Sequence, residues 1–116
     1  RALRGTAAGT RLRPVAARYG SVGLLGYSMG GYGALRLAAA LAADSAVLIS
    51  PQVSIAAAVV PFDRRYRAEG QLFDATLGDL TTRALPRLRG LILLDPFVAA
   101  DLRHARMITA LFPGLA

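Results

Sequence analysis

The chain has 116 residues, 54% of them hydrophobic, and a formal net charge of +7. That length is enough for one small domain with a hydrophobic core, and the apolar runs are too short to span a bilayer. The sequence has no cysteine and one histidine, which excludes disulfides and thiolate metal ligands and argues against any metal site. We therefore expect a single domain over residues 1–116, with no cofactor, no metal and no membrane segment.

The positive charge comes from arginine alone, because the sequence contains no lysine. These arginines are scattered and do not alternate with aromatic residues, so we expect no binding of nucleic acid. Abundant alanine and arginine without lysine are typical of a GC-rich genome. The arginine-rich start has no apolar segment like that of a signal peptide, and we expect a cytoplasmic protein. The sequence leaves the oligomeric state open.

The first elements in chain order are a helix and a strand. Residues 1–11 have no clear period and are interpreted as a loop. A helix is predicted over Leu12–Tyr19, with Pro14 in its first turn, where a missing N–H is tolerated. Gly20 ends this helix, and an apolar strand is predicted at about 22–26.

A glycine-rich turn with a serine at its apex follows that strand. Residues 26–31 read GYSMGG and fit the pattern G-x-S-x-G, and an apolar helix is predicted from Gly33 to about Ala43. A strand, a sharp turn and a helix form the context of a nucleophile elbow, with Ser28 at its apex. Gly26 and Gly30 are expected to leave room for strand and helix to approach each other. The alternative is a glycine-rich turn that holds a serine by chance.

The second half of the chain supplies two further strands and a helix. Short apolar strands are predicted at 46–50 and 91–94, and a helix at 101–111 with Asp101 as its N-cap. The segment 54–60 is ambiguous, and a short helix is expected at either 77–80 or 81–85. Strands that are apolar without alternation are typical of a parallel sheet buried on both faces. The sequence predicts an α/β fold, with three parallel strands and helices on both faces.

A serine nucleophile needs a base and N–H donors for the oxyanion. At an elbow, the first donor is the backbone N–H of the next residue, here Met29. The second donor normally belongs to an earlier loop, which residues 1–20 do not supply. Tyr27 and Met29 flank the serine, and they either line an acyl pocket or pack against neighbouring strands.

Two aspartates are candidates for the acid that orients the base. Asp95 ends the third predicted strand, which places it on the same sheet edge as Ser28, and it is the favoured acid. Asp101 is the competitor. The structural alternatives are a turn residue before Pro96 for Asp95 and the helix cap for Asp101.

His104 is the only histidine of the chain. It lies inside a predicted helix soon after Asp95, and a partly exposed helix residue is the plainer interpretation. The chain starts at Arg1 and ends directly after a helix, so we interpret it as part of a longer domain. Either His104 is the base, or the base lies beyond Ala116. The arginines at 64, 65 and 67 either meet an anionic substrate or form a solvated surface.

The segment GYSMGGYGALR at 26–36 resembles the elbow of bacterial α/β-hydrolase-fold serine hydrolases. The resemblance covers about residues 12–115 and points to a poorly characterised branch of that superfamily. Its other segments are ISPQ at 49–52, VPFDRRY at 60–66 and DPF at 95–97. It implies the central-to-C-terminal part of such a domain, with Ser28 as nucleophile and Asp95 or Asp101 as acid. The family's early strands, first oxyanion loop and final histidine have no counterpart here.

The hypothesis from the sequence is therefore a serine hydrolase that acts on an ester-like, small-molecule acyl substrate through an acyl-enzyme. An acyltransferase with the same nucleophile is one alternative. A non-catalytic binding module with the hydrolase fold is another. The sequence does not indicate which substrate is used.

Overall fold

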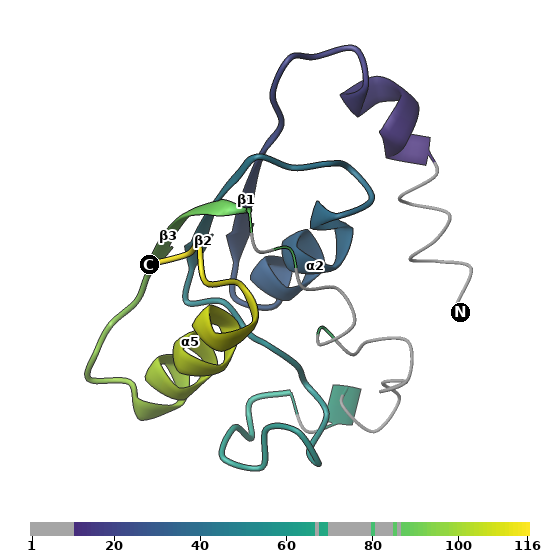
Figure 1. Cartoon of the computed structure of the whole chain (residues 1–116). Coiled ribbons are helices and arrows are strands. Elements are labelled where there is room, and N and C mark those ends of the chain that lie inside the picture. The colour runs from purple at the N-terminus through teal and green to yellow at the C-terminus, as the bar shows by residue number, and fades with distance from the viewer. Residues whose placement is uncertain (1–10, 67, 70–79, 81–84, 86) are drawn as a thin grey trace.

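The structure is a computed structural model that describes residues 11–66, 68–69, 80, 85 and 87–116. Figure 1 shows its elements in chain order, which are β1 (Gly23–Tyr27), α2 (Met29–Ala38), β2 (Ser45–Ile49), β3 (Arg89–Leu93) and α5 (Ala99–Leu111). Residues 11–16 form a further short helix before β1.

The predicted strands and helices are confirmed, with ends that shift by a few residues. The elbow helix begins and ends earlier than predicted, at Met29 and Ala38. The ambiguous segment 54–60 is neither helix nor strand. The predictions for 1–10, for 77–79 and for most of 81–85 lie outside the described residues. No helix in the described part of the chain has the length and apolar character needed to cross a membrane.

The three strands form one parallel sheet in the order β1-β2-β3. Gly26 pairs with Leu48 of β2, which in turn pairs with Ile92 of β3. These findings confirm a small α/β fold with a three-stranded parallel sheet flanked by helices. Because the strands are parallel, their carboxyl ends meet at one edge of the sheet, and Ser28 and Asp95 both follow strands at that edge.

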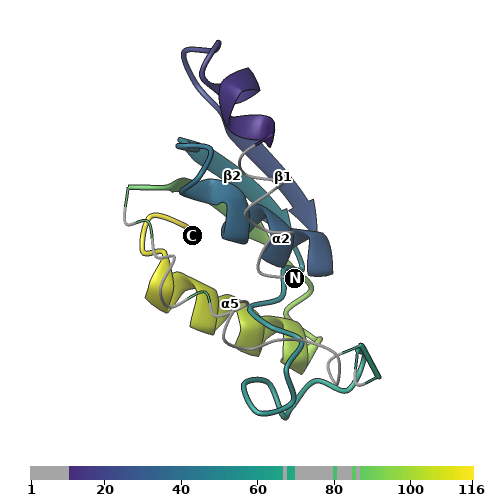
Figure 2. The same cartoon turned by 90° about the vertical axis from the view of Figure 1, so that its right-hand side faces the viewer.

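One face of the sheet carries the core. Ala46 and Leu48 of β2 are buried there against side chains of the two helices. Figure 2 shows α2 and α5 on the same side of the sheet. The fully buried residues Leu35 of α2 and Ile108 of α5 belong to this core.

The opposite face of the sheet is exposed. Successive strand residues point to opposite faces, and the residues that alternate with the core positions are large and apolar. They are Leu25, Tyr27, Val47, Ile49, Leu91 and Leu93. The sequence predicts helices on both faces of the sheet, but in the described part of the chain helices cover only one face. The cause is topological, because strands added in one direction with right-handed crossovers place each connecting helix on the same face.

The chain after α5 returns to the sheet beside β3. Leu115 forms a parallel bridge with Gly90. The Ile92 N–H donates to the carbonyl oxygen of Ala116 at 2.8 Å, and the Ala116 N–H donates to that of Gly90 at 3.2 Å. The segment β3–α5–Leu115 therefore repeats the crossover that β1–α2–β2 makes, and it extends the sheet in the same direction.

Candidate active site

Ser28 is the only residue between β1 and α2, and its backbone is strained. Its φ is 56° and its ψ is −121°, a conformation that non-glycine residues rarely adopt. Such a residue destabilises the fold by about 1–3 kcal/mol and persists only where its surroundings hold it. The side chain does not cap the helix that follows. A sharp strand-to-helix turn with Ser28 at its apex is therefore present, as the sequence predicts.

Backbone hydrogen bonds hold this turn in place. The Ser28 N–H donates to the carbonyl oxygen of Ile49 at the end of β2, at 2.9 Å. The Ser28 carbonyl oxygen accepts from the N–H of Gly31 at 3.0 Å and from that of Gln52 at 3.2 Å. Both backbone polar groups are thus satisfied, and the serine is tied to the segment that follows β2.

Two glycines allow the close approach that the turn needs. A Cβ on Gly26 would lie 2.7 Å from both the Gly30 oxygen and the Gly31 Cα. A Cβ on Gly31 would lie 2.7 Å from the Cβ of Pro51. The expectation for Gly26 is therefore confirmed, but the expectation for Gly30 is wrong, because a Cβ there would meet nothing within 4 Å. The tight contact falls one residue later, where the first turn of α2 packs on Pro51.

Met29 occupies the first helical position after the serine. Its N–H has no acceptor within the helix, because the first N–H groups of any α-helix lack one. The positive end of the helix dipole adds to the field at this point. Met29 as an oxyanion donor stays a prediction, and it is compatible with this placement.

Asp95 lies just beyond β3, at the same sheet edge as Ser28, and it is exposed. Its Oδ1 accepts from the N–H of Phe97 at 2.9 Å, and its carbonyl oxygen accepts from the N–H of Val98 at 3.0 Å. Asp95 is thus the turn residue that the structural alternative describes. Since β2 lies between β1 and β3, two strand spacings, about 10 Å, separate the backbones that carry the serine and this carboxylate. A histidine side chain fits in that interval.

Asp101 is not the N-cap of the last helix, which is the position that the sequence predicts for it. The helix α5 begins at Ala99, with Val98 as its N-cap, so the N-cap prediction is wrong. Asp101 lies in the first turn, is buried, and accepts from Arg65 Nη2 through Oδ1 at 2.7 Å. Its carboxylate therefore belongs to an ion pair, whereas that of Asp95 is at the surface.

Asp101 is part of a cluster that also contains Asp63, Arg65 and His104, called the Asp63 cluster below, in which Arg65 is exposed and the other three residues are buried. Arg65 donates from Nε to Asp63 Oδ1 at 3.0 Å and from Nη2 to Asp63 Oδ2 at 2.8 Å. The hydrogen bond from Arg65 holds the pKa of the Asp63 carboxyl well below its ordinary value of 3.8. The same contact raises the pKa of Arg65. Both groups therefore stay charged at neutral pH.

His104 is fully buried, so the interpretation as a partly exposed residue is wrong. Its Nδ1 accepts from the N–H of Val53 at 3.0 Å, so that nitrogen carries no proton. The proton is then on Nε2, which lies 2.8 Å from Asp63 Oδ2 and donates to it. Burial lowers the pKa of His104 below its ordinary value of 6.5. Because both ring nitrogens are engaged, His104 is not available in this arrangement as the base for Ser28.

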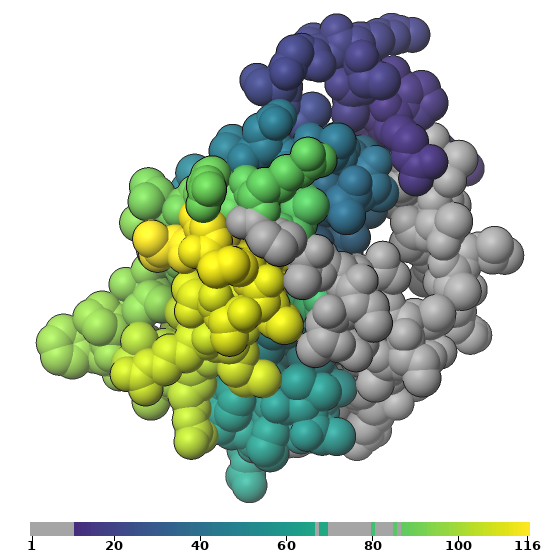
Figure 3. Space-filling model, in the orientation of Figure 1, coloured from purple at the N-terminus to yellow at the C-terminus, as the bar shows by residue number. Residues whose placement is uncertain are grey.

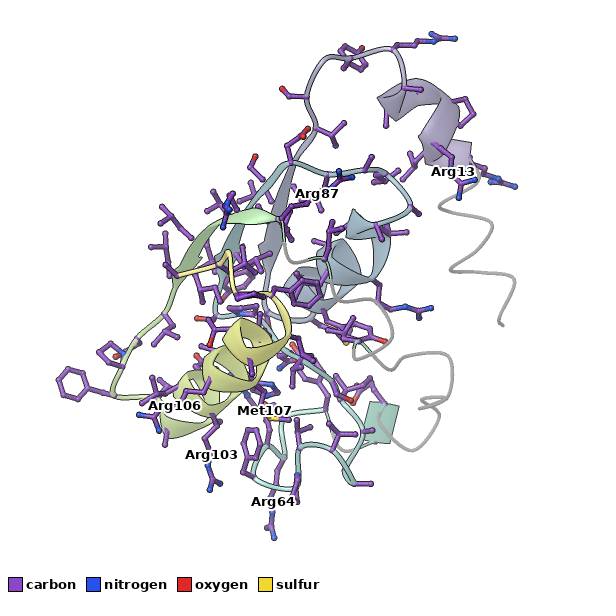
Figure 4. The ribbon with its side chains drawn as sticks, viewed as in Figure 1. Arg13, Arg64, Arg87, Arg103, Arg106 and Met107 are labelled. Carbon is purple, nitrogen blue, oxygen red and sulfur yellow. The ribbon has the colours of Figure 1, made fainter. Side chains whose placement is uncertain are left out.

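The described structure brings Tyr66 to the serine, which sequence reasoning missed. Tyr66 Oη lies 3.2 Å from Ser28 Oγ, although the two residues are 38 positions apart in the sequence. The only sequence signal is its place at the end of VPFDRRY, one of the segments that carry the resemblance. Of the neighbouring arginines, Arg65 belongs to the Asp63 cluster and position 67 lies outside the described residues. Arg64 is exposed, and its side chain points away from the fold (Figure 4).

No group of three or more histidine, cysteine, aspartate or glutamate side chains suited to a metal ion occurs within the described residues. Within the Asp63 cluster, Arg65 pairs with both carboxylates instead, which leaves one net negative charge because His104 is neutral. The chemistry of the cluster is that of a structural ion-pair network beside the candidate nucleophile.

Gln52 is 1% exposed, and neither polar atom of its carboxamide has a hydrogen-bond partner among the residues that the structure describes. Burying such unpaired groups is unfavourable, and replacing them by apolar atoms of the same shape removes the penalty. We expect Gln52→Met to raise the free energy of unfolding by about 1–2 kcal/mol, measured by urea denaturation. An equal or lower stability would show that the carboxamide is satisfied in solution by bound water.

Comparison of the chain with protein-family models, with curated proteins and with solved structures finds no match. Its function is therefore inferred from its own residues.

Proposed function

We propose that this chain carries the nucleophile of an α/β-hydrolase-type serine hydrolase that acts on an ester-like acyl substrate. One observation carries the proposal, namely Ser28 at φ 56° and ψ −121° between a parallel strand and a helix. A glycine would adopt this conformation without strain. A serine in its place, with no capping role for its side chain, supports a use for the hydroxyl itself.

The reaction proposed for Ser28 is acyl transfer to water. Oγ attacks the substrate carbonyl carbon, its proton passes to a base, and the carbonyl π pair moves to oxygen, where the Met29 N–H stabilises it. Collapse of this intermediate breaks the ester C–O bond, and the alcohol leaves with the proton from the base. Water then attacks the acyl-enzyme and releases the acid.

The proposal needs an imidazole base oriented by a carboxylate. His104 is engaged on both nitrogens, so the proposal assigns the base to a histidine outside residues 1–116. Asp95 is the better acid of the two candidates, because it is exposed at the edge that carries Ser28, whereas Asp101 is paired with Arg65. The parallel bridge at Leu115 supports this assignment, since a strand in that position runs toward the same edge.

The two other functions differ in what they require of this site. An acyltransferase uses the same acyl-enzyme with an alcohol or amine acceptor, and product analysis with competing acceptors distinguishes it. A non-catalytic binding module has no acyl-enzyme at all. The engagement of His104 within the Asp63 cluster is the observation that favours the module.

A fluorophosphonate probe tests the proposal in the full-length protein. We expect covalent labelling at Ser28, lost completely in Ser28→Ala. Ser50→Ala is the matched control, because Ser50 also has a positive φ, of 45°, and follows β2 at the same sheet edge. The control is expected to label like the wild type. Absence of labelling in the wild type, or labelling that survives Ser28→Ala, contradicts the proposal.

A further inference from the structure

We infer that Tyr66 is a second catalytic residue of this site, and that the Asp63 cluster positions it against Ser28. The inference rests on the proposed function, which it deepens by naming a group that acts on the nucleophile. Neither the elbow pattern nor its expected partners include a phenol at this place.

The contact between the two hydroxyls carries the inference. Tyr66 Oη lies 3.2 Å from Ser28 Oγ, in a partly buried position, and either oxygen can donate. A serine hydroxyl has one proton and two acceptor lone pairs, so this contact leaves capacity for a base. When the proton leaves Ser28, Oγ gains negative charge, and a phenol O–H at this distance stabilises that charge.

The residue before Tyr66 is anchored at both its backbone and its side chain. The Arg65 N–H donates to Asp63 Oδ1 at 3.0 Å, as does its Nε. Its Nη2 bridges to Asp63 Oδ2 at 2.8 Å and to Asp101 Oδ1 at 2.7 Å. Planar guanidinium groups that bind two carboxylates lose most of their freedom. The backbone that presents Tyr66 is thereby fixed to the first turn of α5.

A second series of hydrogen bonds ties residues 52–53 to Ser28 and to α5. The Gln52 N–H donates to the Ser28 carbonyl oxygen at 3.2 Å, and the next N–H, that of Val53, donates to His104 Nδ1 at 3.0 Å. His104 in turn donates to Asp63 at 2.8 Å. The contacts form a closed ring from Ser28 through residues 52–53, α5 and residues 63–66 back to Ser28. Figure 3 shows the teal surface of residues 51–66 directly against that of α5.

The composition of the ring favours a positioning role for the cluster. The ion pairs of Arg65, whose side chain is 43% exposed, add little net stability, because solvent screening and desolvation of the carboxylates offset most of the attraction between the charges. What they supply is a defined geometry for the groups attached to them. Here those groups are the strained serine and the tyrosine that touches its reactive oxygen.

Ser28→Cys provides a test that does not depend on hydrolase activity. The chain has no cysteine, so this variant contains a single thiol at the elbow. Alkylation by iodoacetamide requires the thiolate, which a donor at Tyr66 stabilises. Adding Tyr66→Phe should raise the pH midpoint of alkylation and slow it about fivefold at pH 7, the effect of one hydrogen bond. The control Tyr19→Phe removes the hydroxyl of a tyrosine that is 68% exposed, and it should leave the profile unchanged.

The second arm uses the native serine and a fluorophosphonate. Tyr66→Phe should lower the maximal rate of labelling about tenfold with an unchanged apparent binding constant for the probe. Asp101→Asn weakens the anchor of Arg65 and should reduce that rate by a smaller factor. Circular dichroism and the melting temperature of each variant report whether the fold is retained.

The two arms separate the failure of each proposal. If Ser28 is not labelled in the wild type but Tyr66→Phe shifts the alkylation profile, the hydrolase proposal fails while the contact stands. If Tyr66→Phe folds normally and changes neither alkylation nor labelling, the role of Tyr66 is overturned.

Discussion

Replacing Gly26 with alanine is expected to disrupt the elbow and to abolish labelling of Ser28. The added Cβ would lie 2.7 Å from the Gly30 oxygen and from the Gly31 Cα, which are backbone atoms that cannot move without shifting α2. Overpacking of this kind destabilises a fold by about 2–3 kcal/mol. Urea denaturation measures the loss of stability, and the fluorophosphonate probe measures the loss of the nucleophile.

The matched variant is Gly30→Ala, which changes the other glycine of the G-x-S-x-G pattern. A Cβ at this position meets nothing within 4 Å. Alanine is favoured over glycine inside a helix, so we expect a gain of about 0.5–1 kcal/mol and normal labelling. Equal stability of the two variants would contradict the packing described here for the elbow.

Replacing Asp63 with alanine is expected to cause the largest loss of stability within the ion-pair network. The change leaves the Nε2–H of His104 and the guanidinium of Arg65 without the carboxylate that joins them. Breaking a fully buried pair costs about 3–5 kcal/mol. Arg65 is 43% exposed and regains water, so we expect about 2–3 kcal/mol. Glu69→Ala, at an exposed position, is the control and should change the stability by less than about 0.5 kcal/mol.

The same network makes the stability of the wild type depend on pH. The folded-state pKa of His104 lies below 6.5, so on acidification the unfolded chain takes up a proton first and stability falls below about pH 6.5. The folded-state pKa of Asp63 lies below 3.8, so its contribution is complete above that pH and is lost below it. Unfolding curves from pH 8 to 3 should show the first loss and the beginning of the second in the wild type, and Asp63→Ala should lack the second.

Much of the scaffold could be predicted from local sequence. Short apolar runs between turn signals specify strands, and their alternation with helices specifies a parallel sheet. The position of Ser28 could be predicted because the pattern G-x-S-x-G between an apolar run and a helix is typical of such a turn. These features depend on neighbours along the chain, whose spacing is visible in the sequence.

The covering of the sheet was predicted only in part. An apolar run such as that of β2 indicates burial on both faces, but one face of the described sheet is open. Which face a helix covers depends on strand order and crossover hand, and strand order is a property of the assembled sheet.

The side chains around the serine were decided by tertiary structure alone. The sequence alone indicates a helix cap at Asp101 and a partly exposed helix residue at His104. Both are buried because the loop that carries Asp63 and Arg65 packs on α5. The sequence by itself determined the strands, the elbow and its serine, through residues adjacent in the chain. Only the folded chain decided which groups meet that serine, because contacts such as Tyr66 with Ser28 join residues 38 positions apart, and a linear pattern carries no information on such distances.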